Sequence, residues 1–119
     1  MMAEDSLQSL NKQLREFAIA RDWLQFQSPK NLSMAISGEC GELIEHFQWL
    51  TEAQSLQLNA DKKREVSYEM ADILIYLLRM ADRLDIDLIA AARDKMTINE
   101  KRFPVDKVHG RAGRAEDYG

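Results

Sequence analysis

The sequence predicts an all-α fold, and three observations support this prediction. Apolar residues recur at steps of three and four along most of the chain, which is the period of a helix with one buried face. No stretch alternates with period two for long enough to indicate a strand. Helix-capping residues stand between the periodic segments. At 119 residues the chain is one domain, whose single core a partner subunit would help to complete.

Two helices are expected before residue 50. The first carries a stripe made by Leu7, Leu10, Leu14, Phe17 and Ala18. Ser28 then reads as an N-cap with Pro29 at the first helical position. The stripe that starts at Leu32 runs through Phe47 and continues toward Leu50, which predicts the second helix.

A short linker is expected between residues 51 and 60. Thr51 is a candidate cap there, and Asn59 is a candidate stop. From Asp61 a third helix runs to about Leu84, with an apolar band broad enough to face two neighbours.

Asp87 can cap a fourth helix, which should stop near Phe103 because Pro104 follows. We therefore expect a domain over residues 1–104, with residues 105–119 as a mobile tail. Four helices with short connections favour a four-helix bundle, completed by oligomerisation as a homodimer or homotetramer.

Composition excludes some function classes. The net charge of −4 argues against binding of a nucleic acid polymer, which favours a basic face. No apolar run approaches the roughly 20 residues of a membrane span. Residues 1–5 lack the basic start and apolar stretch of a secretory signal, and Cys40 is the only cysteine. We expect a cytoplasmic protein.

Two carboxylate pairs carry the candidate chemistry. Glu39 and Glu42 lie three residues apart on the second helix, and Glu69 and Asp72 have the same spacing on the third. One such pair is typical of a solvated helix face, but two pairs within apolar stretches of successive helices are not. If the faces meet, each pair of charges repels by about 4 kcal/mol at an effective dielectric of 20. The cluster then needs a cation.

Carboxylate oxygens select Mg²⁺ or Mn²⁺, and an incomplete protein shell leaves positions for phosphate oxygens. The expected substrate is therefore a phosphate ester. Gly38 and Gly41 interrupt the ligand-bearing turn, which indicates that a ligand or a neighbouring helix approaches the backbone there.

The ordered set of motifs resembles the MazG-type all-α nucleoside triphosphate pyrophosphohydrolases, in the branch that contains the dCTP pyrophosphatases. The acid pairs are separated by 26 residues, and the likeness covers about residues 5–104. The matching motifs are Arg21-Asp22-Trp23-x-x-Phe26, Pro29-x-Asn31-Leu32, Gly38-Glu39-Cys40-Gly41-Glu42-Leu43, Phe47-Gln48-Trp49, Asp72-Ile73-Leu74-Ile75-Tyr76-Leu77 and Lys95-Met96-x-x-Asn99-x-x-Arg102-Phe103-Pro104.

The resemblance implies hydrolysis between the α- and β-phosphates, which gives a nucleoside monophosphate and pyrophosphate. It makes Glu39, Glu42, Glu69 and Asp72 the catalytic residues and the Mg²⁺ ligands, with Mn²⁺ as a substitute. Which carboxylate, if any, acts as general base toward water stays open.

The resemblance also implies a substrate-binding set. Trp23 and Trp49 match aromatic residues around the base, although either could be ordinary core. Tyr76 lies one turn after Asp72, so its hydroxyl could reach a sugar or phosphate oxygen or simply pack. Along the fourth helix, a phosphate-binding side is made by Lys95, Asn99 and Arg102, for which a salt-bridged surface stripe is the alternative.

The substrate that we expect is dCTP or a modified cytosine deoxynucleotide, in nucleotide pool sanitation. Leu14 is aliphatic where relatives specialised for dCTP tend to have a histidine, so the base stays open. A dUTPase-like hydrolase, or a non-catalytic helical dimerisation module that senses nucleotides, is the alternative. A di-iron bundle would require Glu-x-x-His pairs, which these motifs lack.

Overall fold

The computed structural model describes residues 6–118, and every regular element within that range is a helix. The predicted all-α class is confirmed. Residues 1–5, on which the expectation about a secretory signal rested, and Gly119 lie outside the described residues. Within residues 6–118, no helix is both long and apolar enough to cross a bilayer.

The chain divides into two compact units, which are described separately; the first extends to Asp85 and the second begins at Ile86. The first unit contains α1 (Leu7–Ala20), the 3₁₀ turn η2 (Leu24–Phe26), α2 (Pro29–Glu45), α3 (Glu52–Ser55) and α4 (Ala60–Leu84). The second unit contains α5 (Leu88–Arg102), α6 (Val105–Val108) and the 3₁₀ turn η3 (Ala115–Tyr118).

The predicted helix caps are confirmed. The Ser28 hydroxyl accepts a hydrogen bond from the Asn31 amide at 3.1 Å, and Pro29 follows at the first helical position. Thr51 forms a reciprocal capping box with Gln54 at the start of α3. The Asp87 carboxylate accepts from the Ala90 amide at 3.1 Å. Each cap satisfies a backbone donor that the first turn of its helix leaves unpaired.

Two boundaries differ from the prediction. α2 ends at Glu45 instead of continuing toward Leu50, because the chain tightens there: the Phe47 amide bonds the Ile44 carbonyl three residues back, at 2.9 Å. Asn59 does not stop the linker. It is the N-cap of α4, and its side chain accepts from the Lys62 amide at 2.8 Å.

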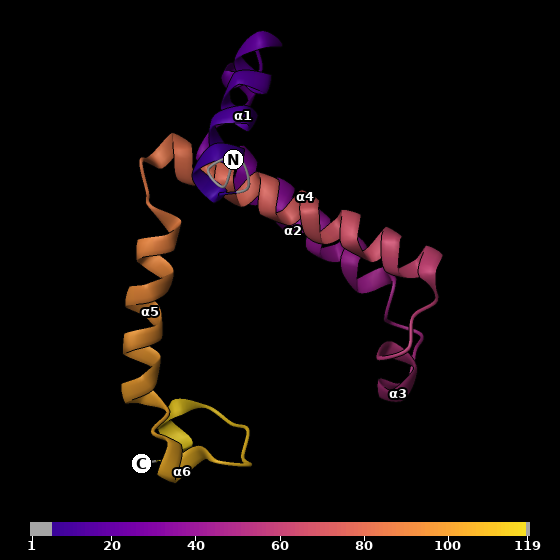
Figure 1. Cartoon of the computed structure of the whole chain (residues 1–119), viewed down its shortest axis with the longest axis vertical. Coiled ribbons are helices and arrows are strands. Elements are labelled where there is room, and N and C mark those ends of the chain that lie inside the picture. The colour runs from indigo at the N-terminus through magenta and orange to yellow at the C-terminus, as the bar shows by residue number, and fades with distance from the viewer. Residues whose placement is uncertain (1–5, 119) are drawn as a thin grey trace. The chain divides into compact units, whose positions relative to one another are not determined.

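α2 and α4 lie side by side and run antiparallel, joined by the segment that contains α3 (Figure 1). α1 also packs on α4. The buried apolar residues come from these three helices and are Ala18, Leu32, Val66, Leu78 and Ala81. This small core fixes the positions of the α2 and α4 faces that carry the candidate site.

The second unit begins with α5, which ends at Arg102 before Pro104 as predicted. The rings of Phe103 and Tyr118 meet edge to face, with their centroids 6.2 Å apart. The Arg111 guanidinium lies 5.1 Å from the centre of the Tyr118 ring. The division into a domain of residues 1–104 and a mobile tail of residues 105–119 stays a prediction.

The apolar band of α4 is not fully covered within the chain. Met70 is 58% exposed and Leu77 is 39% exposed, whereas Leu78 and Ala81 are buried. Uncovered apolar side chains on the central helix are what the expected oligomer would bury. The four-helix bundle and its completion by a second chain remain predictions.

Candidate functional site

Three acidic side chains from two helices converge in the first unit. Glu39 of α2 and Glu69 and Asp72 of α4 each present one carboxylate oxygen, and these oxygens all lie within 4.8 Å of one another. All three side chains are half-buried. The structure therefore brings together three of the four acids that the sequence singled out as metal ligands.

The fourth acid, Glu42, lies against two of the others. Its exposed side chain shares a hydrogen bond with Glu39 and another with Glu69. A hydrogen bond between two carboxyl groups requires a proton on one of them. The four acids are thus a single interacting group, with Glu42 at its solvent side.

The cluster changes the acidity of its members. The pKa of Glu39 is raised from 4.5 to about 7, first by its loss of solvent and then by its hydrogen bond to Glu42, with repulsion from Asp72 and Glu69 added. Loss of solvent and contact with Glu42 also raise the pKa of Glu69, while nearby His46 opposes the rise. Crowded carboxyls therefore retain protons in the absence of a counter-charge.

Two oxygens of the cluster favour a bound cation. Oε2 of Glu39 and Oε2 of Glu69 are buried, and neither has a hydrogen-bond partner among the described residues. A buried acceptor without a donor is destabilising by about 1–3 kcal/mol. A divalent metal ion would satisfy both oxygens and neutralise the repulsion, so the donor set fits the metal site predicted from the sequence.

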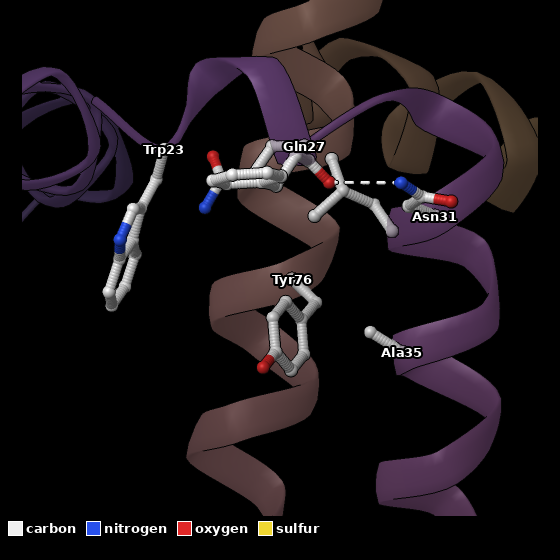
Figure 2. A pocket seen from close by; sticks show the side chains of 7 residues that line it. Trp23, Gln27, Asn31, Ala35 and Tyr76 are labelled. Carbon is white, nitrogen blue, oxygen red and sulfur yellow. Dashed lines mark hydrogen bonds between the residues drawn. The ribbon is translucent and has the colours of Figure 1, made fainter. Parts of the chain in front are cut away.

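A pocket of about 340 Å³ opens beside the same two helices (Figure 2). Its volume falls at the lower end of the range for small-molecule sites, about 300–1,000 Å³. It is lined by Trp23, Phe26, Gln27, Asn31, Leu32, Ala35 and Tyr76. Trp23 and Tyr76, both predicted as substrate-binding residues, thus line one pocket.

The end of α1 places Trp23 at this pocket. Asp22 takes a left-handed backbone conformation with φ of 55°, and the Trp23 amide reaches back to the Ala18 carbonyl at 2.9 Å. Together with the bond from the Asp22 amide to the Ile19 carbonyl, this is a Schellman motif. The indole meets the Phe17 ring edge to face, with centroids 5.7 Å apart, so packing fixes its orientation.

Asn31 holds the opposite wall of the pocket. Its side-chain amide donates to the Phe26 carbonyl at 3.1 Å, the bond drawn dashed in Figure 2. This bond ties the η2 turn to the start of α2.

The pocket and the acidic cluster are one helical turn apart. Ala35, in the pocket, precedes Glu39 by four residues on α2, and Tyr76 follows Asp72 by four residues on α4. Because α2 and α4 run antiparallel, both steps lead the same way along the helix pair, by about 6 Å. A ligand about the length of a nucleotide could thus touch both places.

The other predicted residues are not brought to this pocket by the first unit. Trp49 follows α2, is 86% exposed and does not line the pocket. Lys95, Asn99 and Arg102 lie on α5 in the second unit, at steps of four and three along one side of that helix. Their proximity to the acids stays a prediction.

Gly38 and Gly41 face open space. A side-chain carbon added at either would meet nothing within 4 Å. Within the described residues of the first unit, no neighbouring helix therefore approaches either glycine, and the close approach expected there stays a prediction.

Sequence reasoning missed several polar residues around the site. Gln27 lines the pocket and bonds Arg79, which is only 2% exposed. At the other end of the cluster, Lys62 Nζ lies 3.2 Å from His46 Nδ1. One signal was available: Arg79 is a cation within the apolar stretch Tyr76-Leu77-Leu78-Arg79-Met80-Ala81, a position where a charge requires a buried partner.

The fold and site define an all-α protein with a carboxylate cluster suited to a metal ion, beside an aromatic-lined pocket. A model of the MazG-like family matches residues 34–117. The dCTP pyrophosphatase 1 of Rattus norvegicus is 40% identical over 116 residues, which cover 96% of this chain and 68% of that protein. The Homo sapiens dCTP pyrophosphatase 1 is 40% identical over 103 residues, which cover 85% and 61%.

A solved structure gives the same result. The crystal structure of a pyrophosphatase from Archaeoglobus fulgidus superposes with a TM-score of 0.78 at 42% identity, over 82% of this chain and 91% of that one. The chain belongs to the MazG-like family. The resemblance read from the motifs is confirmed, and so is the predicted enzyme class, a nucleoside triphosphate pyrophosphatase.

Proposed function

We propose that this enzyme hydrolyses a deoxynucleoside triphosphate, with dCTP or a modified cytosine analogue as the preferred substrate, to the monophosphate and pyrophosphate. One observation carries the proposal: a carboxylate cluster suited to a divalent cation lies one helical turn from an aromatic-lined pocket on the same helix pair. The names of the relatives, dCTP pyrophosphatase 1, support cytosine as the base.

Mg²⁺ is the proposed cofactor, with Mn²⁺ as a substitute, because hard oxygen donors favour these ions. Glu39, Glu42, Glu69 and Asp72 would hold it. When bound, the metal supplies charge neutralisation for the phosphates and a lower pKa for a coordinated water.

The side chains of the protein would bind the base, the sugar and the phosphates and would accept the proton. The Trp23 indole offers a flat face on which the base can stack, and Tyr76, which lines the pocket one turn after Asp72 on α4, can offer its hydroxyl to the sugar or a phosphate. If one of the four acids acts as general base instead of holding the metal, Glu42 is the best suited, because it is the acid most accessible to solvent in the cluster. Lys95, Asn99 and Arg102 would bind the triphosphate from α5, and Trp49 would contact the base from an adjoining chain.

We further propose that the enzyme works in the cytoplasm as a homodimer or homotetramer and keeps unwanted nucleotides out of the deoxynucleotide pool. Uncovered apolar side chains on α4 and the exposed Trp49 support an oligomer.

Pyrophosphate release from a panel of canonical and modified nucleoside triphosphates tests the proposal. With Mg²⁺, the wild type should prefer a cytosine deoxynucleotide, and Glu42→Gln and Asp72→Asn should lose activity while keeping the helical circular dichroism spectrum. Glu45→Gln, on the same helix outside the cluster, is the matched control. Selective cleavage of dUTP would favour the dUTPase-like alternative. If no nucleotide is cleaved with Mg²⁺ or Mn²⁺, the nucleotide-sensing module becomes the better account.

A further inference from the structure

A buried arginine lies directly behind the pocket. Arg79 of α4 is 2% exposed, and its guanidinium makes two hydrogen bonds in different directions. Nη1 donates to Asp82 Oδ2 at 2.8 Å, and Nε donates to the Gln27 side-chain oxygen at 2.9 Å. Asp82 is held in turn by Arg15 of α1, whose Nε donates to the carboxylate at 2.9 Å. The network joins α1, α4 and the pocket wall.

This network fixes which end of the Gln27 amide is free. Arg79 has only donors, so it must face the amide oxygen; a flipped amide would oppose two N–H groups. The oxygen is therefore occupied. The amide nitrogen Nε2 has no partner among the described residues, and Gln27 is one of the side chains that line the pocket (Figure 2).

We propose that Gln27 is a specificity-determining residue that donates a hydrogen bond from Nε2 to an acceptor on the pyrimidine edge, and that Arg79 is the positioning residue that holds it in this orientation. The inference rests on the proposed function, in which the pocket holds the base. It adds a fixed donor to a pocket whose other lining residues are mostly aromatic or aliphatic.

The fixed orientation decides what the pocket can accept. A donor pairs with the O2 or N3 acceptors of cytosine and cannot pair with its N4 amino group. Gln27 therefore selects how the base sits, and a contact to N3 would also exclude uracil, whose N3 carries a hydrogen. An amide free to flip would accept either edge and would not discriminate, so the buried arginine gives the contact its selectivity.

Binding of dCMP measured by calorimetry tests the contact without metal or turnover. The ligands are dCMP, its 3-deaza analogue, which lacks the N3 acceptor, and its 2-thio analogue, in which O2 is replaced by a weak acceptor. The variant is Gln27→Met, which keeps the side-chain size and removes the donor. In the wild type, one analogue should bind about tenfold more weakly than dCMP, the equivalent of one hydrogen bond. In Gln27→Met, all three ligands should bind within about twofold of one another.

The proposal is overturned if the wild type and Gln27→Met respond equally to both analogues, or if dCMP does not bind the wild type. The proposed function fails separately, if dCTP is not cleaved although dCMP binds with the expected pattern.

Arg79 is tested by Arg79→Lys, which keeps the charge but removes the planar donors that hold the amide. The variant should lose most of the discrimination between dCMP and the weaker analogue, while its affinity for dCMP falls by less than about fivefold. A purely structural arginine would change all three affinities by the same factor, and that result would remove Arg79 from the proposal. Arg15→Lys, in the same network but farther from the pocket, is the control for general loosening.

Discussion

Glu39 on α2 and Asp72 on α4 lie opposite each other, and each presents a carboxylate oxygen within 4.8 Å of the other. Among residues 6–118, no basic side chain forms a hydrogen bond or an ion pair with either acid. Like charges this close destabilise the protein without a cation, and they bind one strongly when it is present. The proposed function and the stability of the metal-free protein would therefore oppose each other at this pair.

Neutralising either acid should reduce activity and stabilise the metal-free protein. We expect Glu39→Gln and Asp72→Asn to lower kcat/KM for the preferred nucleotide by about 10²–10³-fold, because charge stabilisation at the reacting phosphate is lost. The Tm of the metal-free protein should rise by about 2–5 °C as the repulsion disappears. Steady-state kinetics and thermal melts check the two effects. Glu45→Gln should change neither kcat/KM nor Tm. If that variant showed the same loss of activity and the same rise in Tm, the effects would not be specific to the cluster.

Stability and metal affinity should depend on pH in opposite ways. The folded-state pKa of Glu39, about 7, lies above its ordinary value of 4.5, so the protonated form is favoured by folding. Its stabilising contribution is full below about pH 4.5 and is lost as the pH rises through 7. Mg²⁺ requires the deprotonated form, so its affinity should rise over the same interval.

Chemical denaturation of the metal-free protein at pH 5.5 and 8 measures the change in stability. Mg²⁺ titrations at the same two pH values measure the change in metal affinity. Glu39→Gln should flatten both trends. A wild-type Mg²⁺ affinity that is independent of pH between 5.5 and 8 would contradict the assignment.

Removing the partner of the buried arginine should be strongly destabilising. Asp82→Asn leaves the Arg79 guanidinium, 2% exposed, without its counter-ion, and we expect a loss of about 3–5 kcal/mol in the free energy of unfolding. Arg15→Ala removes a more exposed partner of the same carboxylate and should be destabilising by about 1 kcal/mol. Urea denaturation at pH 7 measures both.

Asp82 should also make the stability of the protein fall at low pH. Hydrogen bonds from Arg15, and also from Arg79, lower the pKa of Asp82 below its ordinary value of 3.8. Its contribution is present above 3.8 and is lost as the pH falls through the lowered value. Asp82→Asn should therefore show less additional destabilisation between pH 4 and 2 than the wild type, and parallel curves for the two proteins would speak against the network.

Removing the indole should weaken substrate binding. Trp23→Ala should raise KM by about tenfold or more, since stacking on an aromatic side chain contributes about 1–3 kcal/mol. The effect on kcat should be smaller, because the ring lines the pocket and is not part of the acidic cluster. Tyr68→Ala, on an exposed part of α4 outside the pocket, is the control. An unchanged KM in Trp23→Ala would place the base elsewhere.

A charge in the uncovered band of α4 should break the oligomer. Leu74 is 37% exposed within the chain, and Leu74→Glu should reduce the mass measured by light scattering from that of a dimer or tetramer to that of a monomer. Arg83→Glu, on the opposite side of α4, should leave the mass unchanged. A wild-type protein that is monomeric at micromolar concentration would contradict the prediction of an oligomer.

Local signals predicted the helices well, and contacts distant in sequence were harder to predict. Ser28, Thr51 and Asp87 act within one turn of their own helices, so residue type and spacing sufficed to identify them. Asn59 was assigned the wrong role because asparagine suits both a helix stop and an N-cap. The end of α2 was missed because apolar periodicity continues through the tight turn after Glu45.

The acidic cluster was predictable because two acid pairs with the same three-residue spacing lie within apolar stretches of successive helices. The polar wall of the pocket was not predictable, since Gln27 and Arg79 are 52 residues apart and their bond depends on how η2 packs against α4. The orientation of the Gln27 amide follows from that bond alone. The polar contacts of the pocket were thus less visible in the sequence than the acidic cluster.

The most direct test of the central claim is phosphorus NMR of the products that the wild-type enzyme forms from dCTP and Mg²⁺. We expect equal amounts of dCMP and pyrophosphate, with no orthophosphate, and a rate that falls by about 10²–10³-fold in Asp72→Asn. Formation of dCDP and orthophosphate would show cleavage between the β- and γ-phosphates instead. If dCTP and every other nucleotide tested stayed intact, the assignment of this site to triphosphate hydrolysis would be contradicted.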